Sequence, residues 1–174
     1  MRFFLLGALL GPIGDYCHVL SGTLAYPGGG IPLWTPLLFG SATWLISLAV
    51  RHLAAVEPVS PHPYVGLAVF LSLYCVSGFL PHGSWIADAV LYSCALAQFK
   101  LQGGPLNLGL ALVAAAGGTA FEATLVHFGV FAYLAGGTGL FGVPTWLPSL
   151  YISAWIAISQ FERRRAMRAP ALRE

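Results

Sequence analysis

Charged side chains are scarce in this sequence. They make up 8% of its 174 residues, whereas 57% of the residues are hydrophobic and the mean hydropathy is +0.78. A soluble domain carries about a quarter charged residues, so this composition excludes a water-soluble fold. The sequence therefore predicts an integral membrane protein, and we expect no nucleic-acid partner.

Cysteines are few, and recognisable catalytic motifs are absent from the sequence. Cys17, Cys75 and Cys94 lie inside apolar segments without a C-x-x-C spacing, which is typical of small buried hydrophobic residues rather than of disulfides or zinc ligands. There is no nucleophile motif, and the three glycines at 28–30 have no lysine after them to form a phosphate loop. We therefore assign no catalytic residue, no metal ligand and no cofactor.

Six apolar runs, separated by residues that break helices, organise the chain. Several are near 16 residues, or roughly 24 Å long, which is short for a hydrocarbon core of about 30 Å. The first has no small-x-small cleavage site, so we interpret it as a retained helix. The sequence predicts a six-helix transmembrane domain over 1–162 and a basic cytoplasmic tail over 163–174. The predicted spans are 3–26, 34–53, 64–80, 85–99, 106–133 and 146–161.

The basic residues all fall on one side of the membrane if six helices alternate in direction. By the positive-inside rule, this arrangement places both termini in the cytoplasm. The short chain with its minimal tail is typical of a prokaryote, so we predict a multi-pass plasma membrane protein. The basic residues are Arg2, Arg51, Lys100, Arg163, Arg164, Arg165, Arg168 and Arg173.

Three tryptophans open the even-numbered spans at the opposite face. Trp34, Trp85 and Trp146 each follow a turn that contains proline. An indole ring can be buried while its N–H stays at the headgroups, so tryptophan is typical of the membrane interface. We expect all three to be interfacial anchors.

The first and fifth spans resemble each other. When 22–26 is aligned with 129–133, Asp15 and Glu122 fall at the same place, seven residues before the glycine. Many membrane folds build a midplane site from internal repeats at matching depth. We therefore predict an all-α bundle with a parallel repeat, in which helices 1 and 2 resemble helices 5 and 6. Both copies continue into a Pro-x-Trp-x-Pro motif, at 32–36 and 144–148.

Asp15 and Glu122 are the strongest candidates for a site. An ionised acid at membrane depth costs several kcal/mol unless it is paired, hydrated or protonated. Both acids should lie about 10 Å below the outer turn. His18 lies one turn above Asp15 on the same face, and His127 follows Glu122 by five residues, so the four residues are candidates to converge.

Two interpretations of these residues stay open. In one, they form the polar end of a cavity that binds a lipid or sterol hydroxyl, relays a proton or coordinates a metal. In the other, they form a structural network between helices one and five, with tyrosines such as Tyr16 or Tyr26 as partners. Metal binding is disfavoured, because neither helix has a His-x-x-Glu or His-Glu-x-x-His spacing.

Several stretches of the chain resemble the Insig (insulin-induced gene) family. The segment 32–42, running to Arg51-His-Leu53, resembles the family's second helix, which has a Trp-x-Pro-Pro opening, a Gly-x-Ala and an Arg-His-Leu end. The resemblance is colinear over nearly the whole chain. The other matching residues are Ala68–Phe70 with Ser77 in the third helix, Leu125–Val126 with Gly129–Val130 and Tyr133 in the fifth, and Trp146–Pro148 in the sixth.

The resemblance implies a compact six-helix bundle with a lipid-facing central pocket. In animals such a pocket binds oxysterols, and the proteins retain sterol-regulatory partners in the endoplasmic reticulum. Asp15 and Glu122 have no counterpart in the family pattern, and the acidic residues that open the family's fourth helix correspond to neutral or histidine positions at 82–84. The resemblance therefore favours a lipid-binding fold over sterol regulation.

We predict a non-enzymatic, lipid-binding or sterol-sensor-like protein with a cavity between helices one, two, three and five. The expected partner is a diacylglycerol-, sterol- or isoprenoid-like membrane lipid. The chain could form a homo-oligomer, and no protein partner is identified. An intramembrane enzyme that acts on a lipid or isoprenoid, and a small transporter, stay open as alternatives. The predicted ligand-binding residues are Asp15, His18, Trp34, Ser77, Glu122 and His127.

Overall fold

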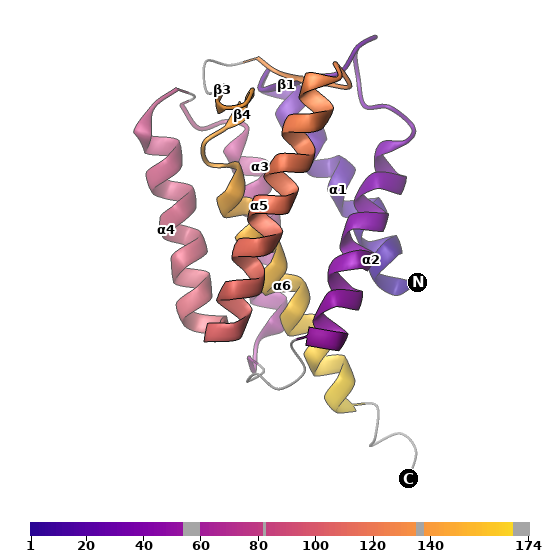
Figure 1. Ribbon diagram of the computed structural model, residues 1–174, viewed down its shortest axis with the longest axis vertical. Helices are drawn as coiled ribbons and strands as arrows, with labels where there is room; N and C mark the ends of the chain where they lie inside the picture. The colour runs from indigo at the N-terminus through magenta and orange to yellow at the C-terminus, as the bar shows by residue number, and fades with distance from the viewer. Residues whose placement is uncertain (54–59, 82, 135–137, 169–174) are drawn as a thin grey trace.

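The structure, a computed structural model, describes residues 1–53, 60–81, 83–134 and 138–168. Within these ranges the chain forms six helices and four short strands. The helices form a bundle, and the strands lie together at one end of it (Figure 1). The helices are α1 (Arg2–Leu20), α2 (Thr35–Leu53), α3 (Pro63–Ser77), α4 (Trp85–Gln102), α5 (Pro105–His127) and α6 (Leu147–Arg168); the strands are β1 (Leu24–Ala25), β2 (Ala132–Tyr133), β3 (Thr138–Leu140) and β4 (Val143–Pro144).

Two helices, α1 and α5, are long and apolar enough to cross a bilayer. They have 19 and 23 residues, and an 18-residue stretch of each has a mean hydropathy of 1.5. α3 is also apolar but has 15 residues. Length and composition therefore identify two candidate spans in the described ranges, fewer than the six that the sequence predicts.

Both α1 and α5 end earlier than the sequence predicts. α1 ends at Leu20 rather than near residue 26, and α5 ends at His127 rather than near residue 133. In each case the chain then passes through a glycine with a positive φ, 72° at Gly22 and 68° at Gly129. A left-handed residue stops a helix and redirects the chain, which glycine does without steric cost.

The segments that follow these two helices pair with each other. β1 and β2 form a two-stranded antiparallel sheet, in which Leu24 lies opposite Tyr133 and Ala25 opposite Ala132. β3 and β4 form a second small sheet at the same end of the bundle (Figure 1). The first sheet joins the turn after α1 to the turn after α5, although they are far apart in the sequence.

α6 is the central helix of the bundle and packs against α2, α3, α4 and α5. Polar side chains on its buried faces bond to the neighbouring helices. Ser153 donates a hydrogen bond to Gln98 of α4, and the indole N–H of Trp155 donates to Asn107 of α5 at 2.8 Å. Because no water is available in an apolar interior, such bonds satisfy buried polar groups and fix how the helices pack.

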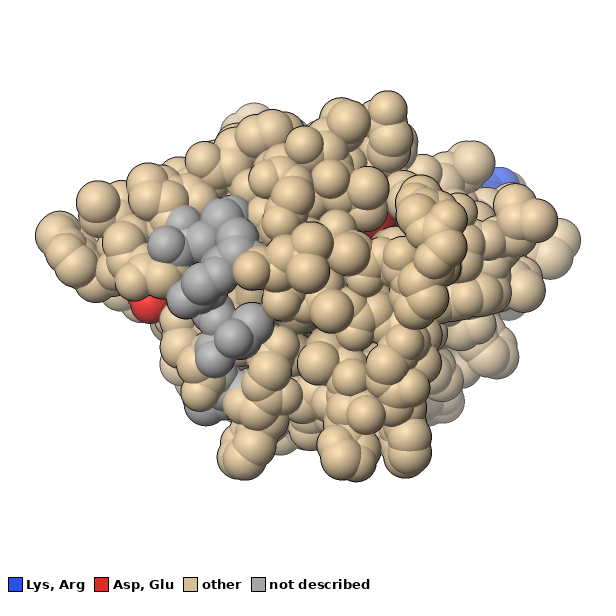
Figure 2. Space-filling model, turned by 90° about the horizontal axis from the view of Figure 1, so that it is seen from above, with Lys and Arg blue, Asp and Glu red and all other residues tan. Residues whose placement is uncertain are grey.

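The last part of α6 extends beyond the predicted sixth span, as far as Arg168, so 163–168 is helical. The side chain of Glu162 is buried there and pairs with Arg51 at the end of α2. α2, α4 and α6 all end at the same end of the bundle (Figure 1), and the face at the opposite end shows almost no charged atoms (Figure 2). The described basic residues at these helix ends therefore lie at one end, whereas the side of the membrane that it faces stays a prediction.

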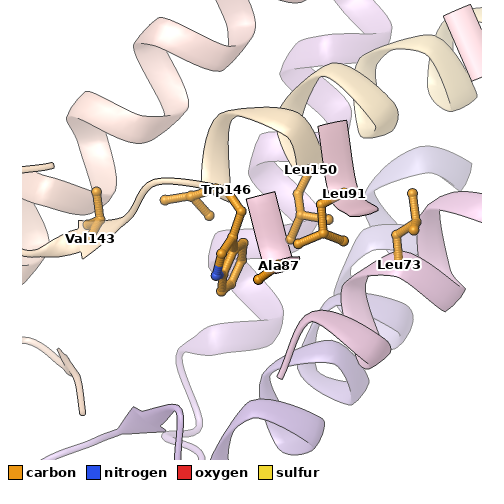
Figure 3. Packing of buried hydrophobic residues seen from close by; sticks show 7 residues of the cluster. Leu73, Ala87, Leu91, Val143, Trp146 and Leu150 are labelled. Carbon is orange, nitrogen blue, oxygen red and sulfur yellow. The ribbon is translucent and has the colours of Figure 1, made fainter. Parts of the chain in front are cut away.

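Trp146 packs in the core, so the prediction that it is an interfacial anchor is wrong. It is 2% exposed and lies against Ala87 and Leu91 of α4 and Leu150 of α6 (Figure 3). The start of α6 is covered by its neighbours, so the residue before this helix is inside the bundle. The other two predicted anchors, Trp34 and Trp85, are 37% and 77% exposed.

Glycines on α1 allow α2 to approach it closely. A Cβ atom at Gly7 would lie 2.3 Å from the Thr43 hydroxyl, and one at Gly11 would lie 2.2 Å from the ring of Phe39. Small residues four apart on one face of a membrane helix let two backbones come together. α1 and α2 therefore pack closely together, and both line the candidate site.

Candidate functional site

A pocket of about 210 Å³ lies inside the bundle and is lined by α1, α2, α3, α5, α6, β1 and β2. Leucine, phenylalanine, isoleucine and alanine side chains make up most of its wall. Its polar groups are two carboxyl groups, four tyrosine hydroxyl groups and one threonine. α6, which the sequence does not predict to be part of the cavity, contributes to the lining. The pocket is therefore mostly apolar, and its polar groups are mainly the two acids and the four tyrosines.

Asp15 contributes the first carboxyl group. It lies on α1 and is 6% exposed. The hydroxyl of Tyr26, just after β1, donates a hydrogen bond to Oδ2, and the hydroxyl of Tyr74 on α3 donates to Oδ1 at 2.6 Å. Each carboxylate oxygen therefore has one tyrosine donor, and the two donors come from different elements.

Glu122 contributes the second carboxyl group and has the same kind of environment. It lies on α5, and the hydroxyl of Tyr133 on β2 donates to Oε2 at 2.5 Å. The hydroxyl of Tyr151 on α6 donates to Oε1 at 2.6 Å. In both halves the tyrosine that follows the helix is eleven residues after the acid.

Two glycines, Gly14 next to Asp15 and Gly118 one helical turn before Glu122, make room for the tyrosines that come from other helices. A Cβ atom at Gly14 would lie 2.2 Å from ring carbon Cδ1 of Tyr74. A Cβ atom at Gly118 would lie 2.3 Å from ring carbon Cε1 of Tyr151. Any larger residue at either position would overlap the ring, so these glycines allow Tyr74 and Tyr151 to reach the carboxyl groups.

The polar part of the pocket is rich in hydrogen-bond acceptors. An ionised carboxylate has about four acceptor positions, of which the tyrosines occupy two, so about half remain. Burial, together with the nearby charge of Asp15, raises the pKa of the Tyr26 hydroxyl above its usual range, so this group stays a donor at neutral pH. In the part of the chain that the structure describes, no group of three or more His, Cys, Asp or Glu side chains is placed to hold a metal ion.

Known proteins resemble this chain in both sequence and fold. No protein-family model matches it. The INSIG protein homolog of Mycolicibacterium vanbaalenii is 32% identical over 180 residues, which cover 97% of this chain and 87% of that protein. The chain belongs to the Insig family. This confirms the family that the helix openings indicate.

Crystal structures from the same Insig family share the fold. The mycobacterial Insig homolog MvINS from Mycobacterium vanbaalenii has a TM-score of 0.85 and 29% identity, covering 93% of this chain and 90% of that one. A cross-linked trimer of a cysteine variant of MvINS has a TM-score of 0.88 and the same identity, covering 97% and 94%. The six-helix architecture is therefore that of the Insig homologue structures.

In this Insig-family chain, four of the predicted site residues lie away from the pocket lining. His18 is 2% exposed and shares a 2.8 Å hydrogen bond with Ser77, which joins α1 to α3. The rings of Trp34 and Tyr26 pack in a T-shaped arrangement, and His127 is exposed at the end of α5, next to Phe128. The structure therefore brings Asp15 and Glu122 to one pocket and gives His18 and Ser77 a contact between helices.

The sequence argument misses three of the four tyrosines. Tyr133 has a signal in the sequence, because the alignment of 22–26 with 129–133 places it opposite Tyr26. Tyr74 and Tyr151 have no such signal, because they lie on other helices at unrelated distances in the sequence. Only the packing of α3 against α1 and of α6 against α5 brings them to the acids.

The tyrosine hydroxyls are expected to stabilise the fold. Replacing Tyr74 or Tyr151 by phenylalanine should lower the free energy of unfolding by about 1.5–3 kcal/mol, because a buried carboxyl group loses a hydrogen-bond donor. Chemical unfolding in detergent, followed by circular dichroism, measures the effect. Tyr16→Phe is the matched control, since Tyr16 is 54% exposed on α1 and lies outside the pocket. Equal losses in Tyr16→Phe and Tyr74→Phe would contradict the prediction.

Proposed function

We propose that this Insig-family chain is a non-enzymatic, sterol-sensor-like membrane protein that binds a lipid in its internal pocket. The observation that carries the proposal is the composition of the pocket, which combines an apolar wall with two carboxyl groups, the buried Asp15 and the half-buried Glu122. Ligand sites are typically apolar clefts with a few polar groups that orient the ligand. In this proposal the apolar part of the lipid lies along the helices, and its polar end lies at the two acids.

The pocket wall also suits a ligand that comes from the membrane. Phe121 lines the pocket and is 49% exposed, so the lining reaches the surface of α5. Leu38 and Ile46 of α2 line the pocket too, while α2 and α5 are not among the helix pairs that pack extensively. An opening between α2 and α5 would face the lipid tails and would let a lipid enter sideways.

We also propose that helices 1 and 2 and helices 5 and 6 form a parallel repeat. The two acids have the same spacing to a bonded tyrosine, and Gly22 and Gly129 have nearly the same positive φ. α1 with α2 and α5 with α6 are also the two most extensively packed helix pairs. A site between two such copies receives equivalent groups from each, which supports a pocket with paired acids.

The orientation and assembly of the chain complete the proposal. The basic ends of α2, α4 and α6 support a bundle with both termini in the cytoplasm, in the plasma membrane of a prokaryote. The cross-linked trimer of MvINS supports the proposal that the present chain, a relative of MvINS, also forms a homo-oligomer. Neither statement is needed for lipid binding within one chain.

The hydrogen bonding of the acids favours a binding site over an intramembrane enzyme. A general acid or base must exchange its proton with the substrate during the reaction. Here both oxygens of Asp15 and both of Glu122 accept a tyrosine hydroxyl. Such groups are held in fixed positions as acceptors, which suits recognition of a ligand.

Identification of the molecule that co-purifies with the protein tests this function. We expect native mass spectrometry after mild detergent extraction to show one lipid per chain, and we expect added lipid of that class to raise the midpoint of thermal unfolding. A chain that stays lipid-free, and gains no thermal stability from diacylglycerol, sterol or isoprenoid lipids, would refute lipid binding.

A further inference from the structure

The pocket offers acceptors to a ligand but few donors. Among the described residues that line it, there is no lysine, arginine or histidine. The hydroxyls of its four tyrosines donate to the two carboxyl groups, which leaves Thr43 as the remaining polar side chain of the lining. A ligand whose polar end is an acceptor, such as a carbonyl or phosphate oxygen, would therefore find little to bind. The polar end of a well-matched ligand must itself supply hydrogen-bond donors.

In the described part of the chain, the pocket lining also has two acids and no basic side chain beside them. Asp15 and Glu122 both line this pocket. The ion pairs of Arg51 and Arg165 involve Glu162, near the far end of α6 and outside the pocket. His18, one turn from Asp15, bonds to Ser77 and does not line the pocket. Two ionised acids in an apolar pocket are costly, so a bound positive charge would be favourable there.

We propose that the ligand is an amphiphile with a protonated amine at its polar end, bound between Asp15 and Glu122. This inference rests on the proposed lipid-binding function and names the chemical class of the lipid. An ammonium group has three donors, one positive charge and no acceptor, so it matches both features of the pocket. A hydroxyl group supplies a single donor and no charge, and a proton on one acid balances charge but leaves the other acceptors unused.

The tyrosines strengthen this preference for a cation. Each tyrosine donates to one carboxylate oxygen. Together the four keep the two acids in place as acceptors before the ligand arrives. Groups that are fixed in advance lose little freedom on binding, so more of the interaction appears as affinity. Tyrosine rings such as Tyr26 and Tyr74 in the lining can also attract a cation through their faces.

The test compares two ligands that differ only in the polar group. Oleylamine and oleyl alcohol are titrated into the purified full-length chain in phosphatidylcholine nanodiscs, and bound ligand is counted by native mass spectrometry. We expect wild-type chain to bind the amine at least about tenfold more tightly than the alcohol, because a charge-assisted hydrogen bond is about twice as strong as a neutral one.

Variants of the two acids test whether the preference for the amine over the alcohol arises in the pocket. In the double variant Asp15→Asn with Glu122→Gln, we expect the preference for the amine to fall at least about tenfold, with alcohol binding retained. Asp88→Asn is the matched control, because Asp88 is a half-buried acid on α4 outside the pocket, and this variant should keep the full preference. The single variants provide a second test if the double variant does not fold.

Each outcome decides between the two proposals. If the wild-type chain binds the amine and the alcohol equally, the ligand is a neutral lipid: the inference fails and the lipid-binding function stands. If Asp88→Asn abolishes the preference, surface charge causes it and the inference also fails. If neither ligand binds and no co-purified lipid is found, the lipid-binding function itself fails.

Discussion

Replacing Ala154 by phenylalanine is expected to lower the affinity for lipid about 100-fold, which corresponds to about 2.7 kcal/mol. Ala154 lies on α6, lines the pocket and is 8% exposed. A phenyl ring at this position would occupy space that we assign to the apolar part of the ligand. The number of lipids bound per chain, counted by native mass spectrometry, measures the effect.

Val113→Phe is the matched control for this substitution. Val113 lies on α5, is 70% exposed and is not part of the lining, so the same ring there would point away from the bundle. We expect this variant to bind lipid as the wild-type chain does. Normal lipid binding by a folded Ala154→Phe chain would mean that the lipid lies elsewhere on the protein.

Replacing Gly118 by alanine is expected to destabilise the protein by about 2–4 kcal/mol. The new Cβ atom would lie 2.3 Å from ring carbon Cε1 of Tyr151, so the ring must move. Overpacking of a core costs about 1–3 kcal/mol, and the shift would also weaken the hydrogen bond from Tyr151 to Glu122. Chemical unfolding of the detergent-solubilised chain gives the change in free energy.

The adjacent residue, Gly117, provides the control. A Cβ atom at Gly117 would meet no atom within 4 Å. Alanine favours a helix over glycine by about 1 kcal/mol at both positions, so any difference between the two variants reports the contact with Tyr151. We expect Gly117→Ala to be neutral or stabilising. Similar losses in the two variants would show that the glycine contact does not hold Tyr151 in place.

The general plan of the fold could be predicted because it follows from composition. Scarce charge and six apolar runs indicate a helical membrane protein, and the spacing of residues such as Arg51 and Lys100 indicates that the basic helix ends lie together. Helix ends were harder to place. The runs 3–26 and 106–133 continue through Gly22 and Gly129 without a change in hydropathy, and only the positive φ of each glycine shows where the helix stops.

The candidate site was predicted in part, for reasons that differ between residues. An acid in an apolar run is conspicuous, so the sequence identifies Asp15 and Glu122 directly. The side chains that bond to them are ordinary tyrosines, and Tyr74 is no more conspicuous in the sequence than the exposed Tyr16. Which tyrosine reaches an acid depends on how closely two helices approach, and that depends on small contacts such as the one at Gly14.

The pairing of β1 with β2 sets an order for the assembly of the protein during its synthesis. Leu24 and Tyr133 are 109 positions apart, so at about 5–20 residues per second the first strand waits roughly 5–20 s for its partner. Asp15 can acquire Tyr26 and Tyr74 early, as soon as α3 is in place. Glu122 depends on Tyr151, which is made near the end of the chain. A ribosome-bound fragment that stops before α6 would therefore hold one acid with both of its donors and leave the other incomplete.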